Sequence, residues 1–196
     1  AVRHLHRVAC GMDSMIFGEV EILRQVRLAM NSSFETGFLT SVLDRLFHSA
    51  LRAGRRLHAE TFLGRHDRSV ASAAITLAHG VLGNISDSRI LVLGAGDAGA
   101  MTIKAKLREG ASDIQVANRT YSRASNLAAH TGTVAVPLRR VPEVLCDVDL
   151  VVCASASPLL SKETLLSVIP MRSRGQIVLV DIGVPRNIDP SVRAIP

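Results

Sequence analysis

The sequence contains no tryptophan, and aromatic residues make up only 3% of its 196 positions. Any hydrophobic core must therefore be aliphatic. The three cysteines, Cys10, Cys146 and Cys153, form no C-x-x-C pair, so neither a disulfide framework nor a zinc site is predicted, and we expect no bound metal. Such sparse cysteine usage is typical of a reducing cytoplasm. No run of 18 apolar residues predicts a transmembrane helix, and no secretory signal pattern is present.

The remaining composition is that of an ordinary globular protein, with 47% hydrophobic and 20% charged residues. A length of 196 residues suits one large domain or two small ones. The net charge of +6 permits contact with a phosphorylated ligand or a nucleic acid without requiring either. The chain begins inside a periodic pattern and stops just after a strand-like segment, so we expect a piece of a longer protein.

Helical periodicity dominates the first part of the chain. Leu5, Val8 and Ala9 fit one face of a short helix that Gly11 ends. Further helices are predicted over 19–30, where residues 31–33 end the helix, and over 38–57, with an apolar stripe from Leu39 to Ala50. Ser69 is a plausible N-cap for a helix that runs to about residue 82. A loop is expected over 61–68 and a turn over 83–87.

From Ser88 the pattern changes to alternating strands and helices, which is typical of βαβ units and a parallel sheet. We therefore predict an α/β fold, with a Rossmann-like doubly wound parallel sheet over 88–196, a linker helix and turn over 69–87, and a helical segment over 1–68. The expected strands are 89–93, 114–117, 133–136, 150–153 and 177–181. The expected helices are 98–108, 121–130, 162–168 and a short one near Glu143.

A glycine motif follows the first of these strands. Gly94, Gly96 and Gly99 have the G-x-G-x-x-G spacing, between an apolar strand and a predicted helix. The first glycine permits the turn, the second lets a pyrophosphate approach the backbone, and the third lets the helix pack close to the strand. The N–H groups at the helix start favour an anion. The motif predicts dinucleotide binding by Gly94, Ala95, Gly96, Asp97, Ala98 and Gly99.

The second strand ends in Asn118-Arg119-Thr120, where an NAD site usually has a carboxylate for the ribose 2′-hydroxyl. Arg119 can instead make paired hydrogen bonds to a 2′-phosphate, with Thr120 donating beside it. This pattern favours NADPH over NADH as the cofactor. The stretches 153–158 and 181–187 follow two later strands, and either could border the nicotinamide or be an ordinary turn.

Other candidate residues lie in the helical part. His4 and His6 are two residues apart, which does not suit a metal pair. Ser14, Glu19 and Glu21 are close in the chain, and Gln25 follows Glu21 by one helical turn. These side chains could recognise an amine or an amide. A capping serine followed by a charged helix face explains the same pattern.

The segment His4-Leu5-x-Arg7-Val8-Ala9-Cys10-Gly11-Met12-Asp13-Ser14-Met15-Ile16-x-Gly18-Glu19 resembles the block that closes the catalytic domain of glutamyl-tRNA reductases. Residues 47–50, 60–61 and 69–72 resemble the linker region of that family. The glycine loop, Asn118-Arg119-Thr120 and 181–187 resemble its cofactor domain. The likeness runs in order over nearly the whole chain, and residues 1–68 would then be the helical end of an α+β catalytic domain.

That resemblance implies NADPH-dependent reduction of glutamyl-tRNA to glutamate 1-semialdehyde, the first step of tetrapyrrole synthesis by the C5 route. His4 would be the active-site histidine, and the substrate-binding residues would be Ser14, Glu19, Val20, Glu21 and Gln25. The family also implies a homodimer formed through a C-terminal domain beyond Pro196, a glutamate-1-semialdehyde aminomutase partner, no membrane, and a cytoplasmic location, or the plastid stroma in a plant.

The sequence departs from the family pattern at several positions. The family's nucleophilic cysteine, which forms a thioester with the substrate, belongs to a segment before Ala1, so we expect the chain alone to bind NADPH but not to complete the reaction. Glu21 stands where the family usually has glutamine, and Val20 where proline is common. Two alternatives remain: a non-catalytic NADPH-binding regulatory or scaffold module, and a shikimate-dehydrogenase-like NADP oxidoreductase, against which the His4–Glu19 segment argues.

Overall fold

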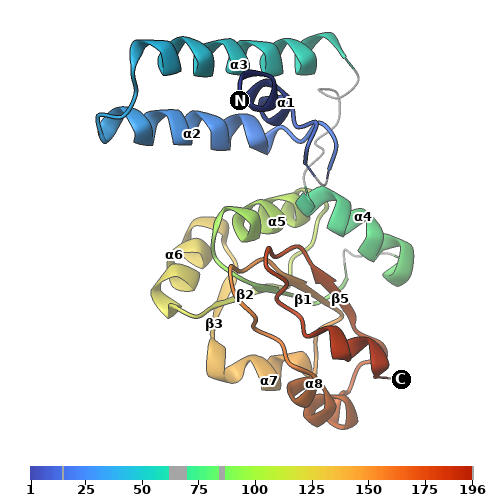
Figure 1. The fold of residues 1–196 in the computed structure, drawn as a ribbon. Helices are drawn as coiled ribbons and strands as arrows, with labels where there is room; N and C mark the ends of the chain where they lie inside the picture. Colours follow the sequence, from blue (N-terminus) through green and yellow to red (C-terminus); the bar gives the residue numbers. More distant parts are fainter. Residues whose placement is uncertain (15, 62–69, 84–86, 196) are drawn as a thin grey trace. The chain divides into compact units, whose positions relative to one another are not determined.

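The computed structural model describes residues 1–14, 16–61, 70–83 and 87–195 (Figure 1). The chain forms two compact units, Ala1–Val70 and Ala71–Pro196. Each unit has its own hydrophobic core. The expected loop at 61–68 lies outside the described residues except for its first position, as do Ser69 and most of the turn at 83–87.

In residues 1–14 and 16–61, the first unit contains three helices, α1 (Val2–Ala9), α2 (Glu21–Glu35) and α3 (Ser41–Glu60). Its buried core joins Ala9 of α1, Leu23 and Val26 of α2, and Ala50 and Leu51 of α3. Gly54 allows α3 to pack closely against α1, because a Cβ there would lie 2.5 Å from the Ala9 carbonyl oxygen. The small residues of α3 therefore set the spacing of this bundle.

The end of α2 differs from the sequence prediction. Asn31, Ser32 and Ser33 do not end the helix, which continues to Glu35. It ends in a hydrogen-bonded cap, in which Gly37 has φ +75° and donates to the Phe34 carbonyl, while the N–H of Phe38 donates to the Ser33 carbonyl. The left-handed glycine is the stop signal, and polar residues one turn earlier are tolerated on the exposed face.

The start of α2 and the apolar stripe of α3 also differ from expectation. The helix begins at Glu21, so Glu19 precedes it and is buried rather than displayed on a helix face. In α3 the first-turn residues Val42 and Leu43 are exposed. The buried face lies further along the helix, because α1 and α2 cover only that part of α3.

The second unit is a parallel five-stranded sheet of order β3-β2-β1-β4-β5. Its fold class is the predicted one. β1, β3 and β5 each begin one residue later than predicted. The strands are β1 (Ile90–Leu93), β2 (Ile114–Asn118), β3 (Val134–Pro137), β4 (Leu150–Cys153) and β5 (Val178–Asp181). The helices are α4 (Val70–Leu82), α5 (Asp97–Arg108), α6 (Tyr121–Thr131), α7 (Val141–Leu145) and α8 (Lys162–Val168), with 3-10 turns at Leu138–Arg140, Ile169–Met171 and Pro190–Ala194.

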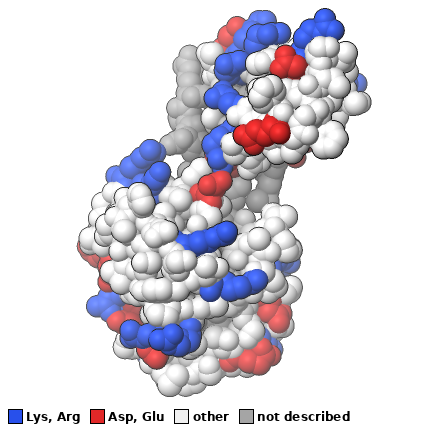
Figure 2. Space-filling view, turned by 90° about the vertical axis from the view of Figure 1, so that its left-hand side faces the viewer, with Lys and Arg blue, Asp and Glu red and all other residues white. Residues whose placement is uncertain are grey.

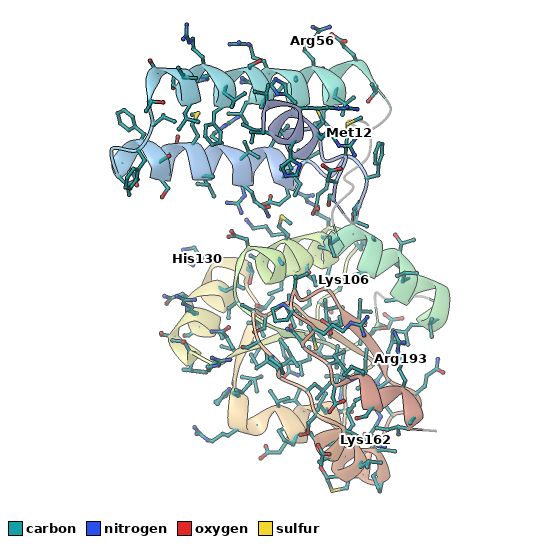
Figure 3. All side chains as sticks on the ribbon, viewed as in Figure 1. Met12, Arg56, Lys106, His130, Lys162 and Arg193 are labelled. Carbon is teal, nitrogen blue, oxygen red and sulfur yellow. The ribbon has the colours of Figure 1, made fainter. Side chains whose placement is uncertain are left out.

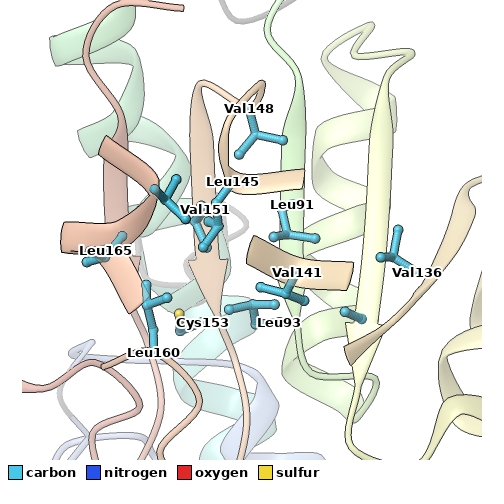
Figure 4. Close-up of a cluster of buried hydrophobic side chains, with 12 residues drawn as sticks. Leu91, Leu93, Val136, Val141, Leu145, Val148, Val151, Cys153, Leu160 and Leu165 are labelled. Atoms are coloured by element: carbon cyan, nitrogen blue, oxygen red, sulfur yellow. The ribbon is translucent and has the colours of Figure 1, made fainter. Parts of the chain in front are cut away.

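The two faces of the sheet are covered by different helices. Ile90 and Val92 of β1 face the core formed with α4, α5 and α6. Leu91 and Leu93 face the opposite core, formed with α7 and α8 (Figure 4). β1 is fully buried on both faces, which explains its unbroken apolar sequence. The chain runs from β1 to β3 on one side and then returns to β4, so the order reverses between β1 and β4.

Candidate functional site

The glycine loop lies at the carboxyl end of β1, where the strand order reverses. This is the position at which open parallel sheets bind ligands. Gly94 has φ +126°, and a Cβ there would lie 2.3 Å from the Ala154 carbonyl oxygen. A Cβ at Gly99 would lie 2.0 Å from the Gly94 carbonyl oxygen. These two glycines therefore serve the fold itself, by bringing β1 against the loop after β4 and α5 against the turn.

Gly96 serves a different purpose. A Cβ at this position would meet no atom within 4 Å, so the fold does not require a glycine here. Gly96 is the N-cap of α5, and Asp97, Ala98 and Gly99 form the first turn of that helix. First-turn N–H groups have no partner within their own helix and attract an anion. The open backbone at Gly96 thus fits the close approach of a pyrophosphate.

Asn118 joins the glycine loop to the end of β2. Its Oδ1 accepts a hydrogen bond from the N–H of Ala95 at 3.3 Å, and its Nδ2 donates to the Thr120 carbonyl at 3.0 Å. Arg119 lies between Asn118 and Thr120 in the chain. Its exposed side chain donates through Nη2 to Ser157 Oγ, in the loop after β4. The guanidinium is thereby held at the carboxyl edge of the sheet, against the loop that follows β4.

The loops after β4 and β5 form one hydrogen-bonded body. Asn187 is fully buried, and its Oδ1 accepts from the N–H of Ser155 at 2.7 Å while its Nδ2 donates to the Ser155 carbonyl at 2.9 Å. Asp181 in turn accepts from the backbone N–H groups of Gly183, Asn187 and Ile188. The stretches 153–158 and 181–187 are thus held together at the same sheet edge as the glycine loop.

In the helical unit, His4 lies on α1 with 75% of its side chain exposed. Its Nδ1 is 3.7 Å from Oδ2 of Asp13, in the turn that also carries Met12 (Figure 3). Asp13 is engaged more closely by Arg7, whose Nη2 lies 2.5 Å from Oδ1. The hydrogen bond from Arg7 lowers the pKa of Asp13, so this carboxylate stays charged beside the histidine.

The other predicted substrate residues do not all meet. Ser14 Oγ donates to Glu19 Oε2 at 2.9 Å, and Glu19 is only 7% exposed. Glu21, at the start of α2, pairs with Arg24 at 2.5 Å. Val20 and Gln25 are exposed on this segment. Described contacts join only Ser14 and Glu19 of this set.

Two of the cysteines, Cys10 and Cys153, have the surroundings of structural rather than reactive residues. Burial, with a smaller contribution from Asp181, raises the pKa of Cys153 to about 12. Burial also raises the pKa of Cys10. Both side chains are therefore neutral thiols near pH 7, and a thiol is a poor nucleophile.

Among the described residues, no group of three or more His, Cys, Asp or Glu side chains could hold a metal ion. No helix in the same residues is both long and apolar enough to cross a membrane.

Comparison with known proteins follows the division into two units. Residues 1–61 match the family model of the glutamyl-tRNA reductase N-terminal domain, and residues 76–196 match the shikimate / quinate 5-dehydrogenase model. The glutamyl-tRNA reductase of Deinococcus radiodurans is 37% identical over 198 residues, covering 100% of this chain and 57% of the relative. That of Methanothermobacter thermautotrophicus is 38% identical, covering 100% and 49%. The chain belongs to the glutamyl-tRNA reductase family.

A solved structure agrees with this assignment. The glutamyl-tRNA reductase from Methanopyrus kandleri matches 100% of this chain and 50% of its own, with 37% identity and a TM-score of 0.61. A dipicolinate synthase structure from Bacillus halodurans covers 61% of this chain and 39% of its own, with a TM-score of 0.51 at 19% identity, which shows a shared fold only. The chain spans about half the length of the curated glutamyl-tRNA reductases that it matches.

The family assignment also explains why the sequence resembles a shikimate-dehydrogenase-like oxidoreductase. The shikimate / quinate 5-dehydrogenase family model covers the nucleotide-binding unit, where Asn118-Arg119-Thr120 lies, whereas the glutamyl-tRNA reductase family model covers the helical unit that carries His4. The likeness therefore concerns the class of nucleotide-binding domain. The two relatives named above, which match over the full chain, are glutamyl-tRNA reductases.

Sequence reasoning missed two long-range contacts in the second unit. One is the hydrogen bond between Arg119 and Ser157. The other joins α4 to the end of α5: His79 Nε2 lies 3.0 Å from the carboxylate of Glu109, which also accepts from Lys106 Nζ, three residues earlier in the chain, at 3.1 Å. Lys106 is fully buried on α5 (Figure 3), and burial lowers its pKa. No local sequence signal marks either contact.

Proposed function

We propose that this chain provides the NADPH-binding and substrate-recognition parts of an enzyme that reduces glutamyl-tRNA to glutamate 1-semialdehyde in tetrapyrrole synthesis. One observation carries the proposal. A helical unit of the glutamyl-tRNA reductase type, bearing His4, precedes a parallel-sheet unit whose glycine loop and Arg119 suit a 2′-phosphorylated dinucleotide. We place the protein in the cytoplasm, or in the stroma of a plant plastid, by analogy with its family.

In the second unit, Gly94 to Gly99 would bind the pyrophosphate through first-turn N–H groups of α5. Arg119 would bind the 2′-phosphate, since a guanidinium forms paired, charge-assisted hydrogen bonds to such a group. Asn118 would keep the two subsites at a fixed spacing, because it bonds to both turns. When bound, NADPH would supply the hydride for the reduction.

In the first unit, His4 would hold or move a proton at its Nε2, with Nδ1 directed at Asp13. Arg7 already neutralises the charge of Asp13, so His4 is not held in a strong ion pair. An imidazole is the usual group for proton transfer near neutral pH. Glu19, fixed by Ser14, would attract the ammonium group of the glutamyl substrate, and Val20, Glu21 and Gln25, which follow it in the chain, would contact other parts of the substrate. We assign the thioester-forming cysteine of the reaction to a part of the enzyme outside residues 1–196.

The tRNA would meet a basic face of α3. Arg45, Arg52, Arg55 and Arg56 are all exposed, and Arg56 projects from the outer side of the helix (Figure 3). Figure 2 shows basic side chains repeated over the helical unit. Such a face binds phosphates without reading sequence. By the same family analogy, we propose a homodimer and a glutamate-1-semialdehyde aminomutase partner for the whole protein.

The cofactor part of this proposal is tested by titrating the chain with NADPH and with NADH. We expect NADPH to bind more tightly by roughly 10- to 100-fold, the worth of charge-assisted hydrogen bonds to a phosphate. Arg119→Ala should remove most of that difference. Arg193→Ala, on the exposed 3-10 turn at Pro190–Ala194, removes the same charge elsewhere and should not. Equal affinities in the starting protein would refute the 2′-phosphate assignment.

A further inference from the structure

The contact between Arg119 and Ser157 crosses the proposed cofactor site. The two residues are 38 positions apart, and they follow β2 and β4 respectively. Both of these strands pair with β1, one on each side, with Leu93 in register with Ala117 and with Cys153. A side chain that reaches from the end of β2 to the end of β4 must therefore pass over the carboxyl end of β1. The glycine loop begins there.

Both ends of this connection are anchored through the backbone. On the β2 side, Asn118 bonds to Ala95 and Thr120. On the β4 side, the buried Asn187 bonds to both backbone groups of Ser155, and the N–H of Ser157 donates to Ser155 Oγ at 3.3 Å. Pro158 further restricts the backbone of Ser157. The loops are thus fixed, and the exposed Arg119 side chain is the part that is free to change its rotamer.

The charges show which partner Arg119 should prefer. Within the described part of the chain, Arg119 has no carboxylate partner, and the interaction found for its guanidinium is with the neutral Ser157 hydroxyl. In the bond to Ser157 only the guanidinium is charged, whereas a phosphate is charged as well and can accept two parallel hydrogen bonds from the same guanidinium. A 2′-phosphate would therefore displace Ser157 from Arg119.

We infer that Ser157 is a positioning residue that holds Arg119 closed over the glycine loop in the free chain, and that a nucleotide bearing a 2′-phosphate releases it. The inference rests on the proposed NADPH site. Either dinucleotide must break the hydrogen bond between Arg119 and Ser157 to reach the glycine loop, which costs free energy. Only NADPH recovers this free energy, because its 2′-phosphate binds the released guanidinium. Ser157 then lowers the affinity for both cofactors equally, whereas Arg119 sets the preference between them.

The test is a double-mutant cycle on the whole chain, with NADPH and NADH as probes in titration and stopped-flow measurements. Ser157→Ala should raise the affinity for both NADPH and NADH by about two- to tenfold, the value of one net hydrogen bond, and should raise their association rates. Ser157→Thr keeps the hydroxyl and should restore the starting behaviour. In an Arg119→Ala background, Ser157→Ala should have no effect. Ser167→Ala, an exposed serine on α8, is the matched control.

Three outcomes would overturn the inference. The first is unchanged or weaker NADPH binding by Ser157→Ala, and the second is the same tightening when Arg119 is absent. Either result would leave the NADPH site standing, because the starting chain would still bind and prefer NADPH. The third is a starting chain that binds neither dinucleotide, which would remove the proposed cofactor site together with the inference. A merely structural role of Ser157 would not produce a dependence on Arg119.

Discussion

Gly94 and Gly96 stand two positions apart in the same loop, yet alanine should affect them in opposite ways. At Gly94, φ is +126° and the new Cβ would lie 2.3 Å from the Ala154 carbonyl oxygen. Backbone strain of about 1–3 kcal/mol and overpacking of a similar size should together lower the free energy of unfolding by roughly 2–6 kcal/mol. For a chain of this length, that is a drop in Tm of roughly 4–24 °C.

Gly96→Ala should lower the Tm by only a few degrees, because its Cβ would meet no atom within 4 Å and the only loss is that alanine is a poorer N-cap than glycine. The methyl group would instead occupy the space that the pyrophosphate needs, so NADPH binding should weaken by about tenfold or more, in line with overpacking costs of about 1–3 kcal/mol. Thermal unfolding by circular dichroism and cofactor titration measure the two effects separately. Equal losses of Tm in both variants, or normal NADPH binding by Gly96→Ala, would refute this division of roles.

Three further perturbations follow from the same structure. In the full-length enzyme, His4→Ala should lower turnover by roughly 10²–10⁴-fold, as expected for loss of a general acid–base group, and should leave cofactor affinity unchanged. His130→Ala is the control for loss of a surface histidine. Near-normal turnover of His4→Ala would exclude His4 from the active site. Asn187→Ala leaves both backbone groups of Ser155 without their hydrogen-bond partner and should lower the free energy of unfolding, measured with urea, by about 2–4 kcal/mol. An unchanged free energy of unfolding would contradict the role given to this buried amide. Burial lowers the pKa of Lys106, so the folded chain binds the ammonium proton less tightly than the unfolded chain. Lys106→Met should therefore raise the free energy of unfolding at neutral pH, and this gain should shrink as the pH rises towards the ordinary lysine pKa. A gain that does not change with pH, or a loss, would contradict the cost assigned to the buried ammonium group.

The sheet could be predicted from the sequence because its signal is local. Each buried strand is a short apolar run bounded by turns, and the run from Ile90 to Leu93 leads directly into the glycine motif. The helical unit was harder to predict. The end of α2 depends on a left-handed Gly37 rather than on the polar residues before it, and the exposure of Val42 depends on how far α1 and α2 reach along α3.

The contacts within the site depend on topology rather than on periodicity. Nothing in the sequence relates Arg119 to Ser157, because their proximity arises only when β2 and β4 take places on either side of β1. The same holds for Lys106 and His79, which share Glu109 across two helices. Residue types therefore indicated which ligand to expect, whereas the fold was needed to show which side chains hold one another.

The most direct test of the proposed function uses the full-length protein with its natural flanking sequence. NADPH oxidation and formation of an aldehyde from glutamyl-tRNA should be measured together. If the proposed reaction is correct, NADPH is consumed only when glutamyl-tRNA is present, in amounts equal to the glutamate 1-semialdehyde formed. If the protein binds NADPH but consumes none with glutamyl-tRNA, the chain is a non-catalytic nucleotide-binding module and the proposed reaction is wrong.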